Sequence, residues 1–195
     1  MILLLARHAA HRGAGQVLSG RTDETGLTEV GRAQAAALTA RLLARPPSML
    51  VASPRRRARE TAAIVATSLK RPVDVADALD ELDYGEWTGR EIASLAAEPA
   101  WRCWNEQRGV GRPPGGEAMH EAQSRILRWI EALPQGGPVL AISHGDVIKA
   151  ALAAFLGLSL DAHQRFDIAP ASLSAIELWP GGGRVLWMNL LAEAA

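Results

Sequence analysis

Short apolar runs that alternate with longer amphipathic segments are the feature that most constrains how this chain folds. Three runs have the length and composition of buried strands: 2–6, 48–52 and 139–142. Each is followed by a segment whose apolar residues repeat at helical spacing. Strands that alternate with helices in this way are typical of α/β proteins with a largely parallel sheet.

The helix starts and the end of the chain extend this prediction. Thr28 is placed to cap a helix that runs to about Leu42, and further helices are expected over about 118–133 and through 148–155. Ser53 and Pro54 predict another helix start, with Ser53 at the N-cap and Pro54 at the first helical position. Near the end of the chain, apolar runs at 173–178 and 185–188 flank a turn at 180–183 and predict a hairpin. The sequence therefore predicts a three-layer α/β/α fold with a mostly parallel central sheet and an antiparallel C-terminal edge.

The length of 195 residues suits a single domain, which we expect to span 1–195. One segment, at about 82–115, interrupts the alternation of strands and helices with glycines, prolines and tryptophans. We expect this segment to be a cap or lid over the sheet rather than a separate domain.

Charge and cysteine content exclude several kinds of protein. Lys and Arg together number 21, as do Asp and Glu, so the net charge is zero and argues against a nucleic-acid-binding protein. The apolar run at 2–6 is too short for a signal peptide or a membrane span. The single cysteine, Cys103, fits a reducing compartment. We therefore expect a cytoplasmic protein with no membrane or nucleic-acid partner.

Polar residues with related chemistry follow all three predicted strands. Arg7 and His8 follow the first strand, the segment 53–57 with its three arginines follows the second, and His144 follows the third. Ligands of open α/β sheets bind outside the carboxyl ends of the strands, so these side chains are expected to meet. Since Arg matches phosphate geometry in a bidentate manner, the sequence predicts a site for a dense anion, with phosphate as the first candidate.

Six short elements lie in a fixed order along the chain. They are Arg7-His8-Ala9, a segment from Gly20 through Asp23 and Thr28 to Gly31, Ser53-Pro54 through Ala62, Leu79 through Gly89, Gly115-Gly116-Glu117, and Ser143-His144-Gly145. Together they resemble the signature elements of the histidine phosphatase superfamily, the phosphoglycerate mutase-like proteins, across nearly the whole chain. The resemblance implies a phosphoglycerate mutase-like fold and favours the phosphatase branch of that family.

The resemblance also implies roles for individual residues. His8 is expected to attack phosphorus and form a phosphohistidine, and Glu81 to act first as general acid and then as general base. Arg7, Arg57 and a protonated His144 are expected to bind the phosphoryl oxygens. A carboxyl group that donates a proton near neutral pH needs a raised pKa, which an apolar lid would supply. No metal and no cofactor is implied, and the expected partner is a small phosphorylated substrate.

The chain departs from the family pattern after His8. Ala9 replaces the signature glycine, and the asparagine that usually follows a few residues later, a phosphate contact in the family, is absent. Alanine would be strained if the backbone needs a positive φ there, or its methyl group would crowd the phosphate. We expect His11 and Arg21 to be the residues that replace the missing contact in substrate binding.

Three functions remain open on the sequence. The first is a phosphomonoester phosphatase that acts on a small phosphorylated metabolite. A phosphoglycerate mutase is the second, disfavoured by the short first loop and the short segment between Glu81 and His144. A catalytically weak phospholigand-binding protein is the third, motivated by Ala9 and Ala10. The oligomeric state is open, a homodimer included.

Overall fold

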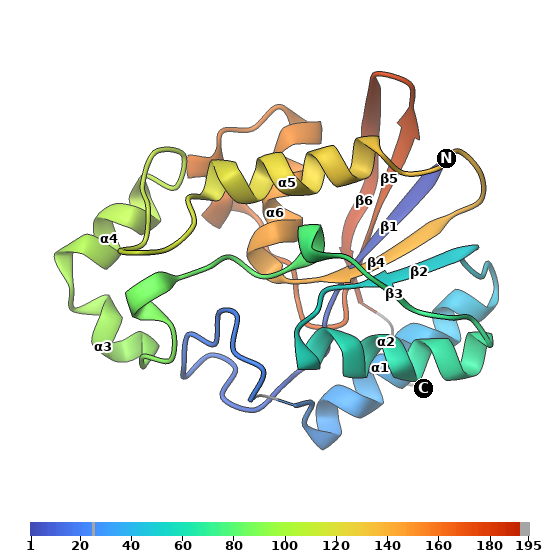
Figure 1. The fold of residues 1–195 in the computed structure, drawn as a ribbon, viewed down its shortest axis with the longest axis horizontal. Helices are drawn as coiled ribbons and strands as arrows, with labels where there is room; N and C mark the ends of the chain where they lie inside the picture. The colour runs from blue at the N-terminus through green and yellow to red at the C-terminus, as the bar shows by residue number, and fades with distance from the viewer. Residues whose placement is uncertain (25, 192–195) are drawn as a thin grey trace.

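The computed structural model describes residues 1–24 and 26–191, and in this part of the chain six strands form one sheet in the order β3-β2-β4-β1-β5-β6 (Figure 1). The strands are β1 (Ile2–Arg7), β2 (Met49–Ala52), β3 (Asp74–Val75), β4 (Val139–Ser143), β5 (Leu173–Trp179) and β6 (Gly182–Leu190). The pairs β1–β4, β2–β4 and β2–β3 are parallel, while β1–β5 and β5–β6 are antiparallel. The predicted mostly parallel sheet with an antiparallel C-terminal edge is confirmed. The two-residue strand β3 was not expected, because it is too short to give a periodic pattern.

Helices cover both faces of this sheet. The α-helices are α1 (Glu29–Leu43), α2 (Arg56–Leu69), α3 (Ile92–Ala96), α4 (Pro99–Glu106), α5 (Met119–Glu131) and α6 (Gly145–Leu156). Short 3-10 helices lie at η1 (Asp77–Leu79), η2 (Gly85–Trp87) and η3 (Leu160–Arg165). In Figure 1, α1 and α2 lie on one side of the sheet and α5 and α6 on the other, which confirms the three-layer arrangement.

The alternation of side chains along β1 builds two separate apolar cores. Leu3 and Leu5 pack with apolar residues of α5 and α6, whereas Leu4 and Ala6 pack with those of α1 and α2. All four are buried, because successive residues of a central strand point to opposite covered faces. These two cores hold β1 and β4 rigidly in the middle of the sheet, which fixes the residues that follow them.

Of the two predicted helix caps, one is confirmed and the other is wrong. The hydroxyl oxygen of Thr28 accepts a hydrogen bond from the backbone N–H of Gly31 at 3.0 Å, so Thr28 caps α1 as expected. Helix α2 instead begins at Arg56, with Arg55 at its N-cap, rather than at Ser53 and Pro54. The hydroxyl of Ser53 is fully buried and lies 2.7 Å from the imidazole Nε2 of His144. Ser53 therefore supports His144 instead of capping a helix.

At Gly31, we expect helix propensity to predict the wrong direction for the change in stability on substitution by alanine. A Cβ atom added there would lie 1.9 Å from the carbonyl oxygen of Ala10, in the loop that follows His8. Gly31→Ala should therefore lower the free energy of unfolding by roughly 1–3 kcal/mol, as overpacking does, although alanine favours helices. Urea unfolding measures this change. The control is Ala36→Gly at an exposed position of α1, which should cost only about 1 kcal/mol; a more stable Gly31→Ala protein would contradict the packing described here.

The segment 82–115 packs against the main body through its own apolar cluster. Trp87, Leu95 and Trp104 are buried there together with Met119 of α5 and Ala150 of α6. Backbone hydrogen bonds also join this segment to the loop after β1, for example from the N–H of Leu18 to the carbonyl of Arg90 at 2.9 Å. Figure 1 shows α3 and α4 beyond the end of the sheet, beside that loop. That this segment works as a cap within a single domain stays a prediction.

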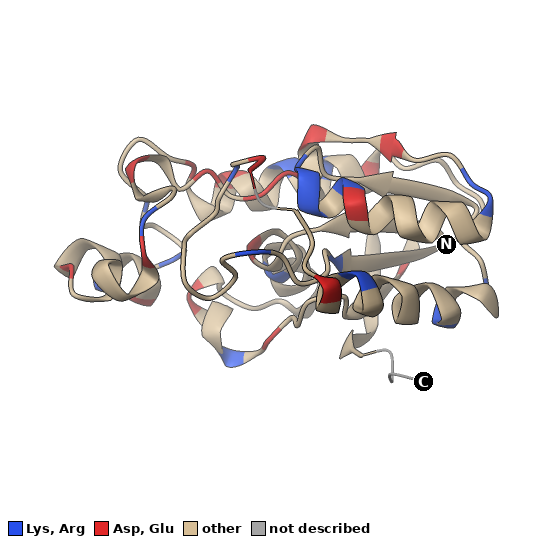
Figure 2. Cartoon of the chain, turned by 90° about the horizontal axis from the view of Figure 1, so that it is seen from below, with Lys and Arg blue, Asp and Glu red and all other residues tan. Residues whose placement is uncertain are grey.

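Charged residues of both signs are distributed along the ribbon. Figure 2 shows basic and acidic positions on the helices and on the loops alike, in agreement with a net charge of zero. Among the described residues, no helix is both long enough and apolar enough to cross a membrane.

Candidate active site

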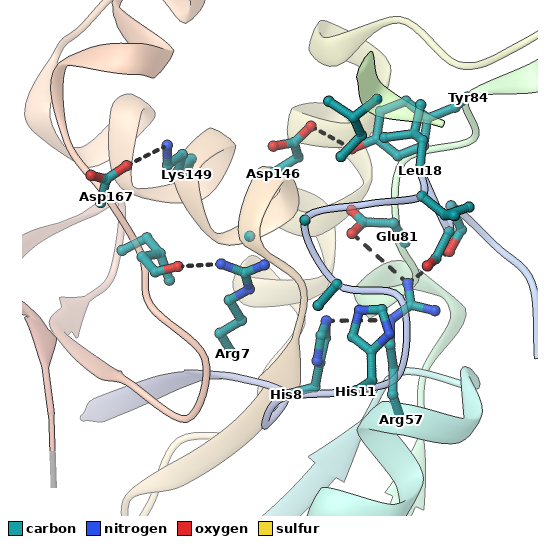
Figure 3. Close-up of a pocket in the computed structure, with 18 residues that line it drawn as sticks. Arg7, His8, His11, Leu18, Arg57, Glu81, Tyr84, Asp146, Lys149 and Asp167 are labelled. Carbon is teal, nitrogen blue, oxygen red and sulfur yellow. Dashed lines mark hydrogen bonds and ion pairs between the residues drawn. The ribbon is translucent and has the colours of Figure 1, made fainter. Parts of the chain in front are cut away.

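Most of the residues predicted for catalysis and phosphate binding meet around one cavity, but His144 is not among the residues that line it. Arg7 ends β1, His8 follows it, Arg57 lies in the first turn of α2, and Glu81 follows η1. Together with His11 they line a cavity of about 200 Å³ at the carboxyl end of the parallel strands (Figure 3). Segments from three parts of the sequence thus place two cationic side chains, two imidazoles and a carboxyl group around the same space.

The His8 ring is held as a neutral tautomer with its lone pair on Nε2. Its Nδ1 lies 2.9 Å from the carbonyl oxygen of Ala9, which only accepts hydrogen bonds, so Nδ1 carries the proton. Its Nε2 lies 3.3 Å from the Nε of Arg57, which donates to that lone pair. Burial, and then the positive charges of Arg57 and Arg7, lower the pKa of His8 well below 6.5. The ring is therefore an unprotonated nucleophile at neutral pH.

The Arg57 guanidinium is fixed by contacts on several sides. Only 1% of the residue is exposed. Nη2 donates to the carbonyl of Gly20 at 2.7 Å and lies 3.1 Å from Nδ1 of His144, while Nη1 donates to the carbonyl of Thr22 at 3.3 Å. A buried cation held by neutral carbonyls and neutral rings keeps most of its charge available to an anion in the cavity.

Arg7 presents a second guanidinium to the same cavity. Its Nη1 donates to the carbonyl of Ile168 at 2.6 Å. Its Nε is buried and has no hydrogen-bond partner among residues 1–24 and 26–191. Gly145 lies directly beside this group, and a Cβ at that position would be in ordinary van der Waals contact with the guanidinium carbon of Arg7, at 3.5 Å. A buried donor without a partner is costly, and an anion bound in the cavity would relieve that cost.

His144 does not carry the positive charge that the sequence led us to expect. Its Nδ1 accepts from Nη2 of Arg57 at 3.1 Å, and its Nε2 donates to the Ser53 hydroxyl at 2.7 Å. Burial, and then the positive charge of Arg57, lower the pKa of His144 well below 6.5. The prediction of a protonated His144 is therefore wrong for the protein without a bound anion. The neutral ring orients Arg57, and it adds no charge of its own.

Glu81 has the proton affinity that a general acid needs. Its Oε1 accepts the backbone N–H of Leu82 at 2.9 Å, and its Oε2 lies 3.9 Å from Nη2 of Arg57. Burial first, and then the negative charge of Asp146, raise the pKa of Glu81 to about 7, against an opposing effect of Arg57. The carboxyl group can thus give up and regain a proton near neutral pH.

The two candidates for the missing phosphate contact lie in different places. His11 lines the cavity, with its ring centre 5.1 Å from that of His8, and burial lowers its pKa to about 4. Arg21 does not line the cavity. Its Nε donates to the carbonyl of Glu81 at 2.8 Å and its Nη2 to a carboxylate oxygen of Glu117 at 2.8 Å. His11 can reach a substrate, whereas Arg21 holds the backbone beneath Glu81.

Some cavity residues escaped the sequence analysis. Asp146 and Lys149 of α6 and Asp167 after η3 all line the cavity, and Lys149 pairs with Asp167 at 3.6 Å. They carry no motif, although Asp146 directly follows Ser143-His144-Gly145 and could have been suspected on that ground. Within residues 1–24 and 26–191, no group of three or more His, Cys, Asp or Glu side chains is arranged to hold a metal ion.

Ala9 is accommodated without strain. Its φ is not among the positive values of the structure, and its methyl group is buried with Leu27, Ala35 and Ala171, away from the residues that line the cavity. Restoring the glycine with Ala9→Gly should lower the free energy of unfolding by about 1 kcal/mol, because a buried methyl group is lost. It should not raise kcat/KM for any phosphomonoester. Thermal unfolding and steady-state kinetics measure both effects, and a marked gain of activity would show that the methyl group does crowd the substrate.

At the edge of this open α/β sheet, one cavity is lined by a neutral histidine, two arginines and a carboxyl group whose pKa is about 7. This is the arrangement expected of histidine-dependent phosphoryl transfer. The sequence profile of the histidine phosphatase superfamily (branch 1) matches residues 3–191. The chain belongs to that superfamily.

Individual relatives agree with this family. The chain is 32% identical to a glucosyl-3-phosphoglycerate phosphatase of Mycolicibacterium vanbaalenii over 175 residues, which are 82% of this chain and 76% of the relative. It is 31% identical to a probable phosphoglycerate mutase GpmB of Salmonella paratyphi C over 181 residues, 89% of this chain and 83% of the relative. A solved structure of a mycobacterial glucosyl-3-phosphoglycerate phosphatase with VO3 matches with a TM-score of 0.86 at 28% identity, over 97% of this chain and 98% of that one. The family and its phosphatase members support phosphatase activity for this chain.

Proposed function

We propose that the protein is a phosphomonoester phosphatase that acts on a small phosphorylated metabolite through a phosphohistidine intermediate on His8. One observation carries this proposal: the lone pair of His8 Nε2 lies in the same cavity as Arg7, Arg57 and a carboxyl group whose pKa is about 7. The likeness to a phosphatase structure that contains VO3, a vanadium oxyanion with three oxygens like a phosphoryl group, also supports an anion site here.

The first half of the reaction forms the phosphohistidine. Nε2 of His8 attacks phosphorus, and the bond from phosphorus to the leaving oxygen breaks as the proton of Glu81 moves to that oxygen. The N–H groups of Arg57 and Arg7 turn to the phosphoryl oxygens and stabilise their charge. The Nδ1–H bond to the carbonyl of Ala9 keeps the ring oriented and stabilises the charge that the imidazole gains.

The second half releases phosphate. Glu81, now a carboxylate, removes a proton from a water molecule whose oxygen attacks phosphorus. The bond between nitrogen and phosphorus breaks, inorganic phosphate leaves, and both His8 and Glu81 return to their starting protonation states. His11, which lines the cavity, is the candidate for a further contact with the substrate.

Two further proposals accompany this function. The segment 82–115 acts as a cap on a single domain, supported by its apolar cluster with α5 and α6 and by its backbone contacts with the loop after β1. The protein works in the cytoplasm, supported by its single, unpaired cysteine, Cys103.

One specific observation favours a second function. Curated relatives named as probable phosphoglycerate mutases are nearly as similar to this chain as the phosphatase relative. A mutase would transfer the phosphoryl group from His8 to a second hydroxyl group instead of to water. The phosphatase ranks first because the solved structure with VO3 that resembles this chain is that of a phosphatase.

Phosphate release separates these functions. The protein is incubated without added metal with p-nitrophenyl phosphate, glycerol 3-phosphate and phosphoglycerates, and inorganic phosphate is measured. We expect steady release from several of these esters. Interconversion of phosphoglycerates without release would identify a mutase, and binding of phosphate without turnover would identify a phospholigand-binding protein.

A further inference from the structure

A half-buried carboxylate with no role in the proposed reaction forms part of the cavity wall. Asp146, in the first turn of α6, accepts hydrogen bonds from the Tyr84 hydroxyl at 2.6 Å, from Nη1 of Arg108 at 2.9 Å and from Nε2 of His163 at 2.8 Å. These three donors come from the segment 82–115 and from η3, outside the catalytic strands. Asp146 of α6 thus joins the segment 82–115 and η3 to the main body at the cavity itself (Figure 3).

Asp146 is a permanent negative charge. Burial opposes its ionisation, but the charge of Arg108 first, and then His163 and the Tyr84 hydroxyl, outweigh burial and hold the pKa of Asp146 well below 3.8. With all its donors in place, the carboxylate has no reason to take up a proton in the range where a phosphatase works.

The negative charge of Asp146 acts on Glu81. Both residues line the same cavity, and Tyr84, which donates to Asp146, lies three residues after Glu81 in the chain. Like charges in a buried site are costly, so Asp146 disfavours the carboxylate form of Glu81. The pKa of Glu81 agrees with this geometry, because Asp146 contributes to its rise, second only to burial.

We propose that Asp146 is a positioning residue for the proton of Glu81, and that Arg108 limits its effect by neutralising part of its charge. The fixed charge keeps Glu81 protonated between turnovers, although Arg57 and Arg7 favour the ionised form. This inference rests on the proposed role of Glu81 as a general acid.

The polar groups around the two carboxyl groups come from several elements, and Asp146→Asn and Arg108→Met each change only one of them. Asp146 is surrounded by Tyr84, Arg108 and His163, with Lys149 on its own helix and Glu81 in the same cavity. The groups around Glu81 are Arg7, Arg57, His144, Tyr84 and Asp146. Removing the charge of Asp146 should therefore lower the pKa of Glu81, whereas removing that of Arg108 should raise it. If Asp146 and Arg108 had a purely structural role, both variants would shift the pKa of Glu81 in the same direction.

Asp146→Asn removes the charge and keeps the shape. The amide oxygen can still accept from Tyr84 and Arg108. The amide NH2 can donate to Nε2 of His163 once that ring moves its proton to Nδ1, which has no partner among the described residues. The variant is thus expected to fold, and near-ultraviolet circular dichroism checks this.

The test is the titration of the Glu81 carboxyl carbon by NMR in protein labelled with 13C-glutamate, with the signal assigned by its loss in Glu81→Gln. Asp146→Asn should lower the midpoint by about one pH unit, which is about a tenfold loss of the protonated form above the midpoint. Arg108→Met, which keeps an apolar contact with the Trp104 ring now 3.5 Å from the guanidinium, should raise the midpoint. Asp161→Asn, at an exposed carboxylate that accepts from Gly109, is the matched control and should leave it unchanged.

An unmoved or raised midpoint in Asp146→Asn would overturn the inference, as would a fall in both Asp146→Asn and Arg108→Met. The readout does not depend on turnover, so it separates this inference from the proposed function. An inactive protein with the expected NMR shifts would refute the phosphatase alone. An active protein in which the basic limb of the pH profile ignores Asp146→Asn would refute the positioning role alone.

Discussion

His8→Ala is expected to lower kcat/KM for every phosphomonoester by at least about 10⁴-fold, because loss of a nucleophile removes the covalent step itself. The neighbouring His144 cannot replace it, because its Nδ1 accepts from Arg57 and its Nε2 carries the proton that it donates to Ser53. Phosphate affinity should be largely retained, since Arg7 and Arg57 remain. Steady-state kinetics and phosphate binding by calorimetry measure the two effects.

His120→Ala is the matched control for this substitution. His120 is an exposed histidine in the first turn of α5 and does not line the cavity. Its removal should leave kcat/KM within about twofold, as is usual for surface positions. If His8→Ala kept a tenth or more of the wild-type activity, His8 would not be the nucleophile.

The loss of kcat/KM in Glu81→Gln is expected to depend on the leaving group of the ester. For alkyl phosphates, whose alkoxide must be protonated as it leaves, kcat/KM should fall by about 10²–10⁴-fold, the usual contribution of a general acid. For p-nitrophenyl phosphate the fall should be much smaller, because p-nitrophenolate is a weak base that leaves without a proton. Kinetics with glycerol 3-phosphate and p-nitrophenyl phosphate measure the difference. An equal loss on both esters would contradict the role of Glu81 as the acid.

The dependence of kcat/KM on pH is expected to follow the loss of the proton from Glu81. Glu81 must carry its proton in the first step, and its pKa is about 7, so kcat/KM for alkyl phosphates should fall as pH rises through about 7. That basic limb should be absent in Glu81→Gln. Glu86→Gln, at an exposed carboxylate of η2 in the same segment, should keep the wild-type profile.

The sequence was sufficient for the sheet and for most of the residues that meet at its edge. Strands such as 2–6 and 139–142 are buried on both faces, so they read as continuous apolar runs, and the residues after them had to lie at one edge. Glu81 and Arg57 could not be found in this way. Only the resemblance to a known family singled them out, because a lone carboxylate in a loop or one arginine among several has no periodic signal.

The sequence misled where a side chain serves a distant partner. Ser53 precedes a helix and has the chemistry of a cap, but its hydroxyl lies against His144, 91 positions along the chain. His144 was expected to be charged, yet Arg57 is so close that burial and repulsion keep the ring neutral. Arg21 binds the backbone of Glu81 instead of substrate. Each of these errors concerns a buried polar contact between remote segments, which local patterns do not encode.

The cluster around Asp146 could not be predicted for the same reason. Tyr84, Arg108 and His163 lie 62, 38 and 17 positions from it, and no motif links them. Only the packing of the segment 82–115 against α6 brings the four side chains together.

The most direct test of the central claim is a rapid quench of the protein with a 32P-labelled phosphomonoester, followed by peptide mapping of the labelled protein. The account predicts one labelled peptide that contains His8, with a phosphoryl bond that is labile in acid and stable in alkali, and no label in His8→Ala. Label on a serine or aspartate, or steady hydrolysis with no labelled protein at any quench time, would contradict it.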